Sequence, residues 1–593
     1  MIRGYLVVIT VLSFFFGWSQ PGGYAGLLEL EKEKTYWDRD STKLRSEGYL
    51  QVTGFSGVGD KFGKWRYFYE NGQMEEIAHY YKGKYNGKVR QFYDNGKLKM
   101  EGTFFLGVPD GEFKAFYRNG KLAEEGMYHS IADSIRDTTM KYWNIIEFLP
   151  PIKLGDWKTY YEDGKPWATY TYKPDDSLEY LMSYHDKKGK QLVNNGDGSI
   201  EEFYSSGKPK LLKSYKNGLL HGDYKSWSAN GNLKEKGSYV NGLKDGEWIY
   251  YHIVSGKLYQ KIGYQEGEKH GVFIERLPND SLAISGEYAN DKKNGHWTYY
   301  FENGQIDMTG NFEYDLQQGH WTYYYPSGQL YYEGDYEKGK KTGDWEFFYN
   351  NGQMWREGAY KNDMKQGVWN FYYENGGDLM IGSFKDDVEH GAWVSYYENG
   401  EEKDRGSYDN GLMTAFWEGY YPNGKKSYEG NYERDMKTGT WKYYTSKGEL
   451  KDEGNYKILK VKEGESVGYD FVLVEEQSYK HGSWKSYSDI DGKIVSEGTY
   501  NRNRQSGTWK YYYPGGDVVA YENSYNSDGK LDGPSRNYSR RGKLVSEINY
   551  KDGKKHGDFK VYGKRGKLEV HYIYKNGVKV KDVIAKKVYK YGK

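Results

Sequence analysis

The sequence predicts an all-β fold, an elongated solenoid of about nineteen stacked 24-residue β-hairpins that form one twisted antiparallel sheet. Self-similarity at such a period indicates one supersecondary unit stacked many times. Asn-Gly pairs recur at a fixed distance after the repeated tryptophan, and glycine and tyrosine are abundant, with 77 and 67 copies. The tryptophan returns every 24 residues through the middle of the chain, at Trp297, Trp321, Trp345, Trp369, Trp393, Trp417 and Trp441.

The N-terminal residues differ from the rest of the chain. A basic residue precedes an apolar run, Tyr5–Phe16, and the small residues Gly17 and Ser19 suit cleavage by signal peptidase. The run is too short to span a bilayer, which needs roughly 20 residues. We therefore expect a signal peptide over residues 1–19 and an N-terminal leader and cap over 20–44. Export would lead to the periplasm, the outer-membrane surface or the extracellular space.

The repeat array is predicted over residues 45–580, with a C-terminal tail over 581–593. Two insertions interrupt it, near 130–154 and 457–480, and each follows the tyrosine that ends a unit. Both insertions therefore leave from the same edge of the array, where additions to repeat proteins often carry function. Another long spacing is interpreted as a decayed repeat around Tyr184–Gly189.

Each unit is predicted to be one hairpin. With the tryptophan at position 0, Asn303-Gly304 occupies +6 and +7, a pair typical of a two-residue type I′ turn. Pairing outward places each tryptophan opposite a glycine at +13, as in Gly310, Gly334 and Gly358. It also places the glycine at −2 opposite an aromatic ring at +15. Because a large ring compensates for a strand glycine, we expect two reciprocal ring–glycine pairs within each hairpin.

Strand alternation separates two faces of each hairpin. Positions 0, +2, +4, +9 and +15 are expected to share an aromatic face on which hairpins pack. The opposite face is polar, apart from an aromatic row at +3. This row is interpreted either as a packing ladder or as a contact surface, since tyrosine rings bind sugars and proteins well. Its candidate partner-binding residues are Tyr300, Tyr324, Tyr372, Tyr396, Tyr420 and Tyr444.

Composition and motifs predict neither an enzyme nor a nucleic-acid-binding protein. The net charge of +1 arises from 85 basic and 84 acidic residues without a basic stripe. Cysteine is absent, which excludes disulfides and thiolate metal sites. Histidines belong mostly to separated repeats, and only His296 and His320 stand in adjacent ones, so metal ligands do not converge. No phosphate-binding or nucleophile motif occurs, and we expect no catalysis, cofactor or metal.

The unit Gly-x-Trp-x-Tyr-Tyr-x-x-Asn-Gly-x(5)-Gly-x-Tyr/Phe, as at Gly295–Phe312, resembles the bacterial variant of the MORN repeat. Gly391–Tyr408 matches it too, with Ser395 in place of the first tyrosine. The resemblance covers nearly all of the chain after the leader. It implies a string of hairpins in one elongated, twisted sheet and a scaffolding or interaction role, in some proteins with lipid contacts. Some bacterial relatives are YwqK-like antitoxins, a cytoplasmic role that an export signal argues against.

Two functions compete at this point. The first is an exported, non-catalytic protein-interaction scaffold at the bacterial envelope, with the two insertions supplying specificity. The alternative is a glycan- or cell-wall-binding array that uses the +3 tyrosines. Lipid contact and an antitoxin-like immunity role are further alternatives, and the sequence does not identify the partner.

Overall fold

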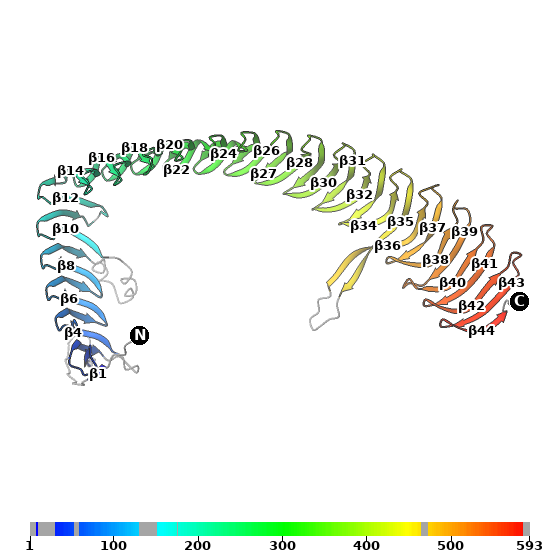
Figure 1. Ribbon diagram of the computed structural model, residues 1–593, viewed down its shortest axis with the longest axis horizontal. Helices are drawn as coiled ribbons and strands as arrows, with labels where there is room; N and C mark the ends of the chain where they lie inside the picture. Colours follow the sequence, from blue (N-terminus) through cyan, green and yellow to red (C-terminus); the bar gives the residue numbers. More distant parts are fainter. Residues whose placement is uncertain are drawn as a thin grey trace, which may run out of the picture. The chain divides into compact units, whose positions relative to one another are not determined.

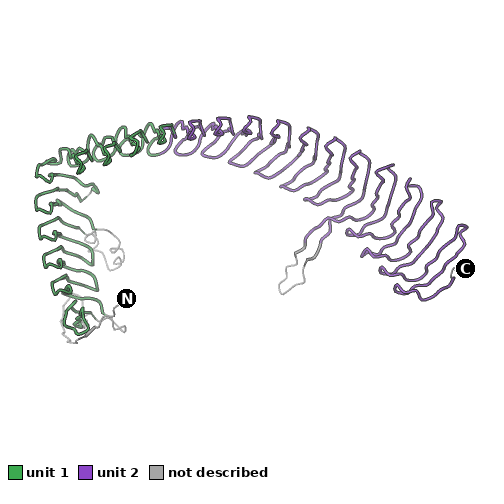
Figure 2. The backbone as a smooth tube through the Cα atoms, viewed as in Figure 1, with its two compact units in different colours: residues 1–282, 287–291 green, residues 283–286, 292–593 purple. Residues whose placement is uncertain are grey.

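The computed structural model describes residues 7–9, 30–51, 59–129, 151–174, 176–463 and 473–584. They form two compact units, coloured separately in Figure 2: residues 1–282 and 287–291, and residues 283–286 and 292–593. Apart from the short strand Val7–Ile9, the predicted signal peptide lies outside the described residues, as does most of the insertion near 130–154. The described parts of the chain contain no helix that is long and apolar enough to cross a membrane.

Every regular element among the described residues is a β-strand. The first strands are β1 (Val7–Ile9), β2 (Leu30–Tyr36), β3 (Leu44–Gln51), β4 (Asp60–Phe68), β5 (Met74–Tyr81), β6 (Lys84–Phe92), β7 (Leu98–Phe105), β8 (Val108–Phe116), β9 (Leu122–His129), β10 (Ile152–Tyr160), β11 (Pro166–Tyr172), β12 (Glu179–His185), β13 (Gln191–Asn194), β14 (Asp197–Phe203), β15 (Pro209–Lys216), β16 (Leu219–Trp227), β17 (Leu233–Val240), β18 (Leu243–Tyr251), β19 (Leu258–Gln265), β20 (Glu268–Arg276) and β21 (Leu282–Ala289). They are followed by β22 (Lys292–Tyr300), β23 (Ile306–Glu313), β24 (Leu316–Tyr324), β25 (Leu330–Glu337), β26 (Lys340–Phe348), β27 (Met354–Lys361), β28 (Met364–Tyr372), β29 (Asp378–Lys385), β30 (Val388–Tyr396), β31 (Glu402–Asp409), β32 (Leu412–Tyr420), β33 (Lys426–Glu433), β34 (Met436–Tyr444), β35 (Leu450–Glu463), β36 (Leu473–Tyr487), β37 (Ile494–Asn501), β38 (Arg504–Tyr512), β39 (Val519–Tyr525), β40 (Leu531–Tyr538), β41 (Leu544–Lys551), β42 (Lys554–Tyr562), β43 (Leu568–Lys575) and β44 (Val578–Ile584).

Within each unit, successive strands pair antiparallel, so that one hairpin follows another (Figure 1). This confirms the predicted fold class, an all-β solenoid of hairpin repeats. The segment interpreted as a decayed repeat is a short hairpin, β12–β13, in which Tyr184 pairs with Val193. The predicted leader contains part of another hairpin, β2–β3.

The turn that contains the Asn-Gly pair is not the predicted type I′ turn. Phe301 N donates to Gln305 O, Gly304 N donates to Phe301 O, and only Gly304 has a positive φ, 86°. This pattern is typical of a type I turn followed by a left-handed glycine. Asn303 serves a different purpose, because its Oδ1 accepts from Gln305 N and its Nδ2 donates to Pro326 O in the next turn. The asparagine therefore links neighbouring turns.

Two-residue turns with positive φ at both positions occur at the opposite edge. Tyr314 and Asp315 have φ values of 50° and 71° and separate the paired residues Glu313 and Leu316. The longer turn at the other edge shifts the register, so that position +3 pairs with +9, as in Tyr300 with Ile306. As a result, +9 joins the face of +3 and +4 enters the turn, which corrects their predicted place on the aromatic face.

The tryptophan ring lies over the glycine of the preceding repeat. The predicted pairing across the hairpin is present, since Trp297 faces Gly310. However, Gly310 also faces Trp321, and a methyl group on Gly310 would overlap the Trp321 ring. Gly334 accommodates Trp345 in the same way, and both rings are 0% exposed. The ring–glycine contact therefore joins successive repeats rather than the two strands of one repeat.

The glycine at −2 has a different role from the predicted one. Gly319 pairs with Tyr336 as expected, but an added methyl group there would meet no atom within 4 Å, so no ring covers it. Its φ is 66°, because the ladder slips between Gly310 and Asn311 and leaves a bulge. At this slip the Trp321 indole Nε1 donates to Asn311 O at 3.0 Å. Glycine is needed for its left-handed backbone.

In the regular repeats the core is a layer of rings on one face of the sheet. Trp345 stacks on Phe347 at +2, with centroids 6.0 Å apart, and meets the edge of Tyr336 of the preceding repeat at 5.1 Å. Lys341 covers the tryptophan, with Nζ 4.4 Å from the ring centroid. Burial, and then the charge of Arg356, lowers the pKa of Lys341. The chain therefore buries its own aromatic face.

The predicted insertion near 457–480 is a continuation of one hairpin. In Figure 1, β35 and β36 run well past the turns of the neighbouring hairpins. Their ladder continues from the Lys457–Tyr479 pair to the Glu463–Leu473 pair. Ser478 Oγ donates to Lys437 O at 2.5 Å and ties the base of the extension to the preceding repeat.

Candidate interaction face

The face opposite the tryptophans carries a continuous cross-strand row, made of position +1 on the first strand of each hairpin and +12, or its equivalent, on the second. We call it the central row. Opposite charges directly across two strands contribute about 0.2–1 kcal/mol each. In the last part of the chain the row alternates in charge from strand to strand, through Glu453, Lys485, Glu497, Lys510, Glu522, Arg536, Glu547 and Lys560.

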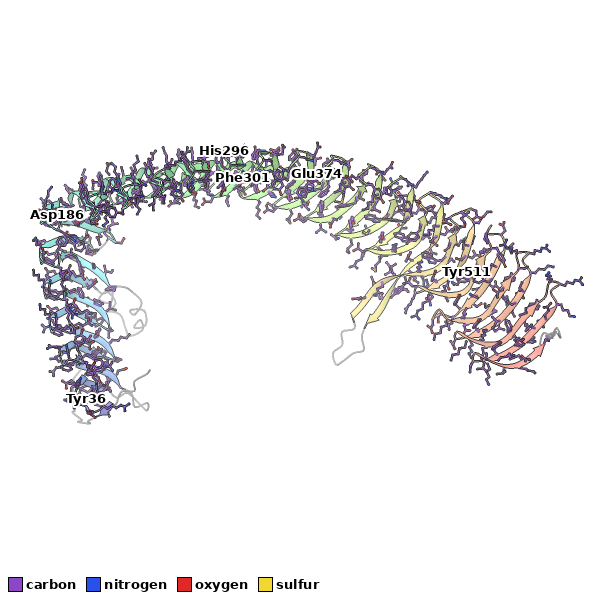
Figure 3. All side chains as sticks on the ribbon, in the orientation of Figure 1. Tyr36, Asp186, His296, Phe301, Glu374 and Tyr511 are labelled. Carbon is purple, nitrogen blue, oxygen red and sulfur yellow. The ribbon has the colours of Figure 1, made fainter. Side chains whose placement is uncertain are left out.

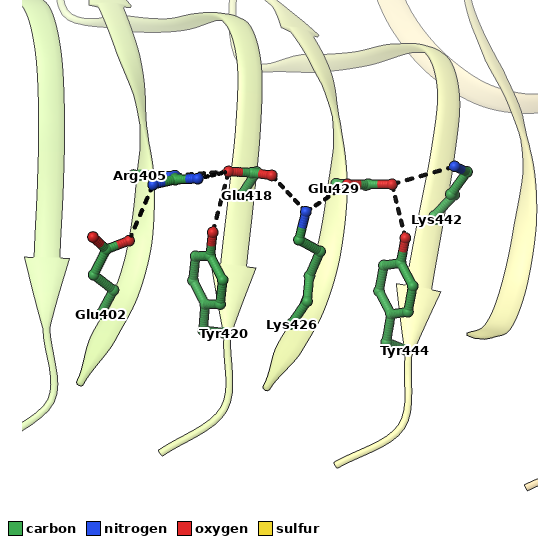
Figure 4. A network of polar contacts seen from close by, with 8 residues as sticks. All are labelled: Glu402, Arg405, Glu418, Tyr420, Lys426, Glu429, Lys442 and Tyr444. Atoms are coloured by element: carbon green, nitrogen blue, oxygen red, sulfur yellow. Dashed lines mark hydrogen bonds and ion pairs between the residues drawn. The ribbon is translucent and has the colours of Figure 1, made fainter. Parts of the chain in front are cut away.

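A closed ion network covers the row between β31 and β34 (Figure 4). Arg405 Nε contacts Glu418 at 2.7 Å, and Lys426 Nζ lies 2.5 Å from Glu418 and 2.8 Å from Glu429. Lys442 reaches Glu429 at 3.4 Å. Burial would raise the pKa of Glu418, but hydrogen bonds from Lys426 and Arg405 outweigh it and lower that pKa. These charges satisfy one another.

The alternation fails over three successive strands. Glu333 stands opposite Glu346, and Glu346 opposite Glu357. Like charges directly opposite are destabilising. Burial, and then the charges of Glu333 and Glu357, raises the pKa of Glu346. Glu333 contacts His320 Nε2 at 3.1 Å, but within the described ranges neither Glu346 nor Glu357 has a lysine or arginine nitrogen within 4 Å. We call these three residues the acidic run.

Directly beyond the acidic run, the central row becomes apolar. Glu357 faces Asn370, Asn370 faces Ile381, and Ile381 faces Val394, before charge returns at Arg405. Around Ile381 and Val394 lies a pocket of about 520 Å³. Its wall includes Val368 and Phe416, whose residues are 58% and 49% exposed. Clustered apolar groups on an otherwise charged face are typical of binding sites.

The predicted +3 tyrosines lie on this face, all half-buried, one per repeat: Tyr300, Tyr324, Tyr372, Tyr396, Tyr420 and Tyr444. They form a row and do not converge on one site. The Tyr372 and Tyr444 hydroxyls donate to Glu357 and Glu429 at 2.7 and 2.8 Å. Burial and these carboxylates raise the pKa of both tyrosines to about 12. Tyr396 is the member that lines the pocket.

Sequence reasoning missed the part played by position +4. Its tyrosine hydroxyl donates to a backbone carbonyl of the next repeat, as from Tyr349 to Tyr372 O and from Tyr373 to Tyr396 O, both at 2.9 Å. The signal was present, because this position retains a hydroxyl in most central repeats although +2 and +3 also accept phenylalanine. Phe301, labelled in Figure 3, occupies the position in the β22–β23 turn without a hydroxyl.

The histidines do not form a metal centre in the part of the chain that the structure describes, where no group of three potential ligands could hold an ion. His320 contacts Glu333 at 3.1 Å and Asp335 at 3.2 Å. His296 Nε2 instead contacts Thr309 Oγ1 of its own hairpin, β22–β23, at 2.9 Å. These two histidines therefore have separate partners on the polar face.

Twelve segments match the sequence profile described as MORN repeat variant: residues 63–82, 85–105, 109–130, 153–173, 197–217, 220–241, 293–314, 317–338, 341–362, 417–434, 437–457 and 531–552. These repeats belong to the MORN repeat variant family. Five of the matched MORN repeats contain one of the seven regular tryptophans together with its +13 glycine partner, and the twelve matches together occur in both units. The identification agrees with the resemblance read from Gly295–Phe312.

No curated protein matches the MORN-repeat chain. Among solved structures, the crystal structure of TcdB2-TccC3-Cdc42 is 10% identical, with a TM-score of 0.12, and the match covers 93% of this chain and 30% of that one. The crystal structure of TcdB2-TccC3 without the hypervariable C-terminal region is also 10% identical, with a TM-score of 0.12, 92% coverage of this chain and 32% of that one. The chain thus spans about a third of these proteins.

Proposed function

We propose that this MORN-repeat chain is a non-catalytic scaffold, exported to the bacterial envelope, that binds a protein partner through the charged face of unit 2. The observation that carries the proposal is the pocket around Ile381 and Val394. It interrupts a face that is otherwise largely charged and that carries ion pairs such as Arg405–Glu418. When a partner covers apolar side chains such as Val368 and Phe416, the burial favours binding by about 25 cal/mol per Å² of apolar surface removed from water.

The face that carries the tryptophans exposes little of its ring surface for a partner to bind. The tryptophans and their neighbouring rings are already covered by the chain itself, since Trp321 and Trp345 are fully buried. The extended hairpin β35–β36 supplies a second feature that stands out from the regular repeats. In this proposal it adds contacts beside the pocket-bearing face and contributes to specificity.

The test is capture from envelope extract with residues 20–593, compared between the unchanged chain and a Val368→Ser/Phe416→Ser variant. Val272→Ser is the matched control, because Val272 stands at the same repeat position and is 47% exposed, but lies outside the pocket. We expect one reproducible partner that the pocket variant loses and the control retains. Equal capture by all three chains would contradict the proposal.

Purified cell-wall glycan and lipid vesicles form two further arms of the experiment. Retention on glycan that free sugar competes away, and that Tyr300→Ala and Tyr324→Ala weaken stepwise, would replace the scaffold by the glycan-binding alternative. Retention on vesicles would favour lipid contact. Both outcomes would contradict a protein partner as the principal ligand.

A further inference from the structure

We propose that the acidic run and the adjoining pocket form one bipartite site for a protein segment that carries lysine or arginine residues next to an apolar side chain. The inference rests on the proposed function and names the chemistry of its partner. Glu333, Glu346 and Glu357 would bind the cationic part, and the pocket between Ile381 and Val394 would bind the apolar part.

The acidic run provides unneutralised charge in a fixed geometry. Each glutamate directly faces the next across the ladder, so the three residues stand on successive strands about 4.8 Å apart. In the last part of unit 2 the same row places a lysine or arginine at alternate strands, as with Lys510 between Glu497 and Glu522. Where two glutamates of the row do face each other, at Glu418 and Glu429, Lys426 bridges them. A partner's cations would supply to Glu346 and Glu357 the neutralisation that their own strands do not.

The two halves of the site are contiguous. From Glu357 the row passes through Asn370 and Ile381 to Val394, three strand spacings or roughly 14 Å. An extended peptide that runs across the strands covers this distance in about four residues at 3.3 Å each. The geometry therefore favours a segment whose apolar anchor follows its last basic residue by about four positions.

The side of the pocket that lies away from the acidic run determines which charge a partner can carry there. Arg405 lines it there, but its guanidinium is held by Glu418 at 2.7 Å and by Glu402 at 3.5 Å. No free cation is therefore offered at that rim to an acidic partner. A nucleic acid or an anionic lipid surface would meet the acidic run and be repelled, so a basic protein segment is the occupant that the charges favour.

The experiment titrates the full MORN-repeat chain into a fluorescently labelled peptide, Lys-Lys-Lys-Gly-Ser-Gly-Leu-Phe, and follows anisotropy. A peptide with three glutamates in place of the lysines tests the charge, and one with two serines in place of Leu-Phe tests the anchor. We expect saturable binding of the first peptide alone, weakened by salt because surface charges are screened.

Two variants of the chain then locate the site. Glu346→Gln/Glu357→Gln should weaken binding by about fivefold, as expected for two exposed ion pairs. Glu497→Gln is the matched control, because Glu497 occupies the same row and accepts from Tyr512 OH at 2.6 Å, as Glu357 accepts from Tyr372 OH at 2.7 Å. The Val368→Ser/Phe416→Ser variant should also lose binding, with its circular dichroism unchanged.

Absence of saturable binding, equal binding of the glutamate peptide, or equal binding by the Glu346→Gln/Glu357→Gln variant would each overturn this inference. Its failure can be separated from failure of the proposed function. If the pocket variant loses the captured envelope partner while the glutamine variant retains it, the scaffold proposal stands and the bipartite site falls. If neither variant alters capture, both fall.

Discussion

At the scale of single residues, the glycine at +13 is the most constrained position in the repeat. A methyl group on Gly334 would overlap the ring of Trp345, which is fully buried and fixed by an indole hydrogen bond to Asp335 O at 3.2 Å. Because the ring cannot withdraw without breaking that bond, we expect Gly334→Ala to destabilise the surrounding repeats by about 2 kcal/mol or more. Urea unfolding followed by tryptophan fluorescence measures this loss.

The bulge glycine provides the contrast. Gly343 has φ 65°, and an added methyl group would meet only Asp335 Oδ2, at 3.8 Å, so Gly343→Ala should cost only about 1–2 kcal/mol, the usual cost of a left-handed alanine. The chain itself contains this substitution, as Ala415 with φ 59° at the equivalent position. A larger loss for Gly343→Ala than for Gly334→Ala would contradict the roles assigned to the two glycines.

The sequence was enough to predict that each tryptophan pairs with a glycine. It was only partly enough to predict which glycine lies under the ring. Counting from the turn placed each tryptophan opposite a glycine of its own hairpin, whereas the covering ring comes from the next repeat. The deciding signal lay outside the regular repeats. Trp248 and Trp509 face Ile262 and Asn523 within their own hairpins. Each nevertheless has a glycine in the preceding repeat, namely Gly237 and Gly498.

Glu346 should make the stability of the folded chain depend on pH. Burial and two neighbouring glutamates raise its pKa above the ordinary value of 4.5. The folded state therefore binds the proton more tightly than the unfolded chain, and stability is lost as the pH rises through the folded-state pKa. We expect Glu346→Gln to raise the melting temperature at pH 7 and to lose this advantage below about pH 4. A melting curve series from pH 3.5 to pH 7 tests this, and a constant difference would contradict it.

At the scale of the hairpin, the longer turn joins each repeat to the next by a hydrogen bond. The longer turn reaches forward through the tyrosine at +4, and Tyr349 OH donates to Tyr372 O at 2.9 Å. Removing the hydroxyl with Tyr349→Phe leaves that carbonyl without the bond, which should cost about 1 kcal/mol. Tyr324→Phe is the control, since no hydrogen bond from its hydroxyl to another described residue is present. Equal unfolding free energies for the two variants would refute the assignment.

The type I′ prediction at Asn-Gly failed for a physical reason. Asn-Gly satisfies both kinds of turn, because the glycine supplies a left-handed residue in either case. In the observed turn the Asn303 side chain also bonds the neighbouring turn, a contact between repeats that pairing within one hairpin does not reveal. The true type I′ positions carry pairs such as Tyr314-Asp315, which give no strong turn signal.

The extension of β35 and β36 should be removable. Lys457 and Tyr479 occupy the positions that flank an ordinary two-residue turn, so replacing residues 458–478 with Asn-Gly would restore a regular repeat. The change removes the Ser478–Lys437 bond from the base of the extension. We expect unchanged circular dichroism and a melting temperature within about 3 °C, since one hydrogen bond contributes about 1 kcal/mol. Unfolding of the array would contradict the modular role.

At the scale of the whole molecule, stability comes from contacts between neighbouring repeats. The strand β44 ends the described array and all its residues are exposed, whereas interior strands are covered on both sides by partners. Hydrogen exchange should therefore be fast in Val578–Ile584 and slow in β26 and β28, whose tryptophans are fully buried. Uniform protection along unit 2 would show that the array unfolds as one block.

Repetition made the architecture predictable, while the interaction face required the three-dimensional register. The acidic run and the pocket consist of residues 11 or 13 positions apart in the sequence, such as Glu346 and Glu357, which the ladder brings directly opposite. With the predicted two-residue turn the two members of the row also face each other. The central row nevertheless gives no repeating signal in the sequence, because its residue types change from repeat to repeat, whereas the aromatic positions recur.

The placement of each tryptophan on the preceding glycine gives the array a direction of assembly. A ribosome delivers roughly 5–20 residues per second, so a new 24-residue repeat emerges every few seconds, whereas a hairpin closes in about 1–10 µs. Each emerging tryptophan, such as Trp345, finds the site at Gly334 already built. At any moment only the newest repeat then lacks the tryptophan that will cover its glycine. This limits how much ring surface a partly synthesised chain exposes to neighbouring molecules.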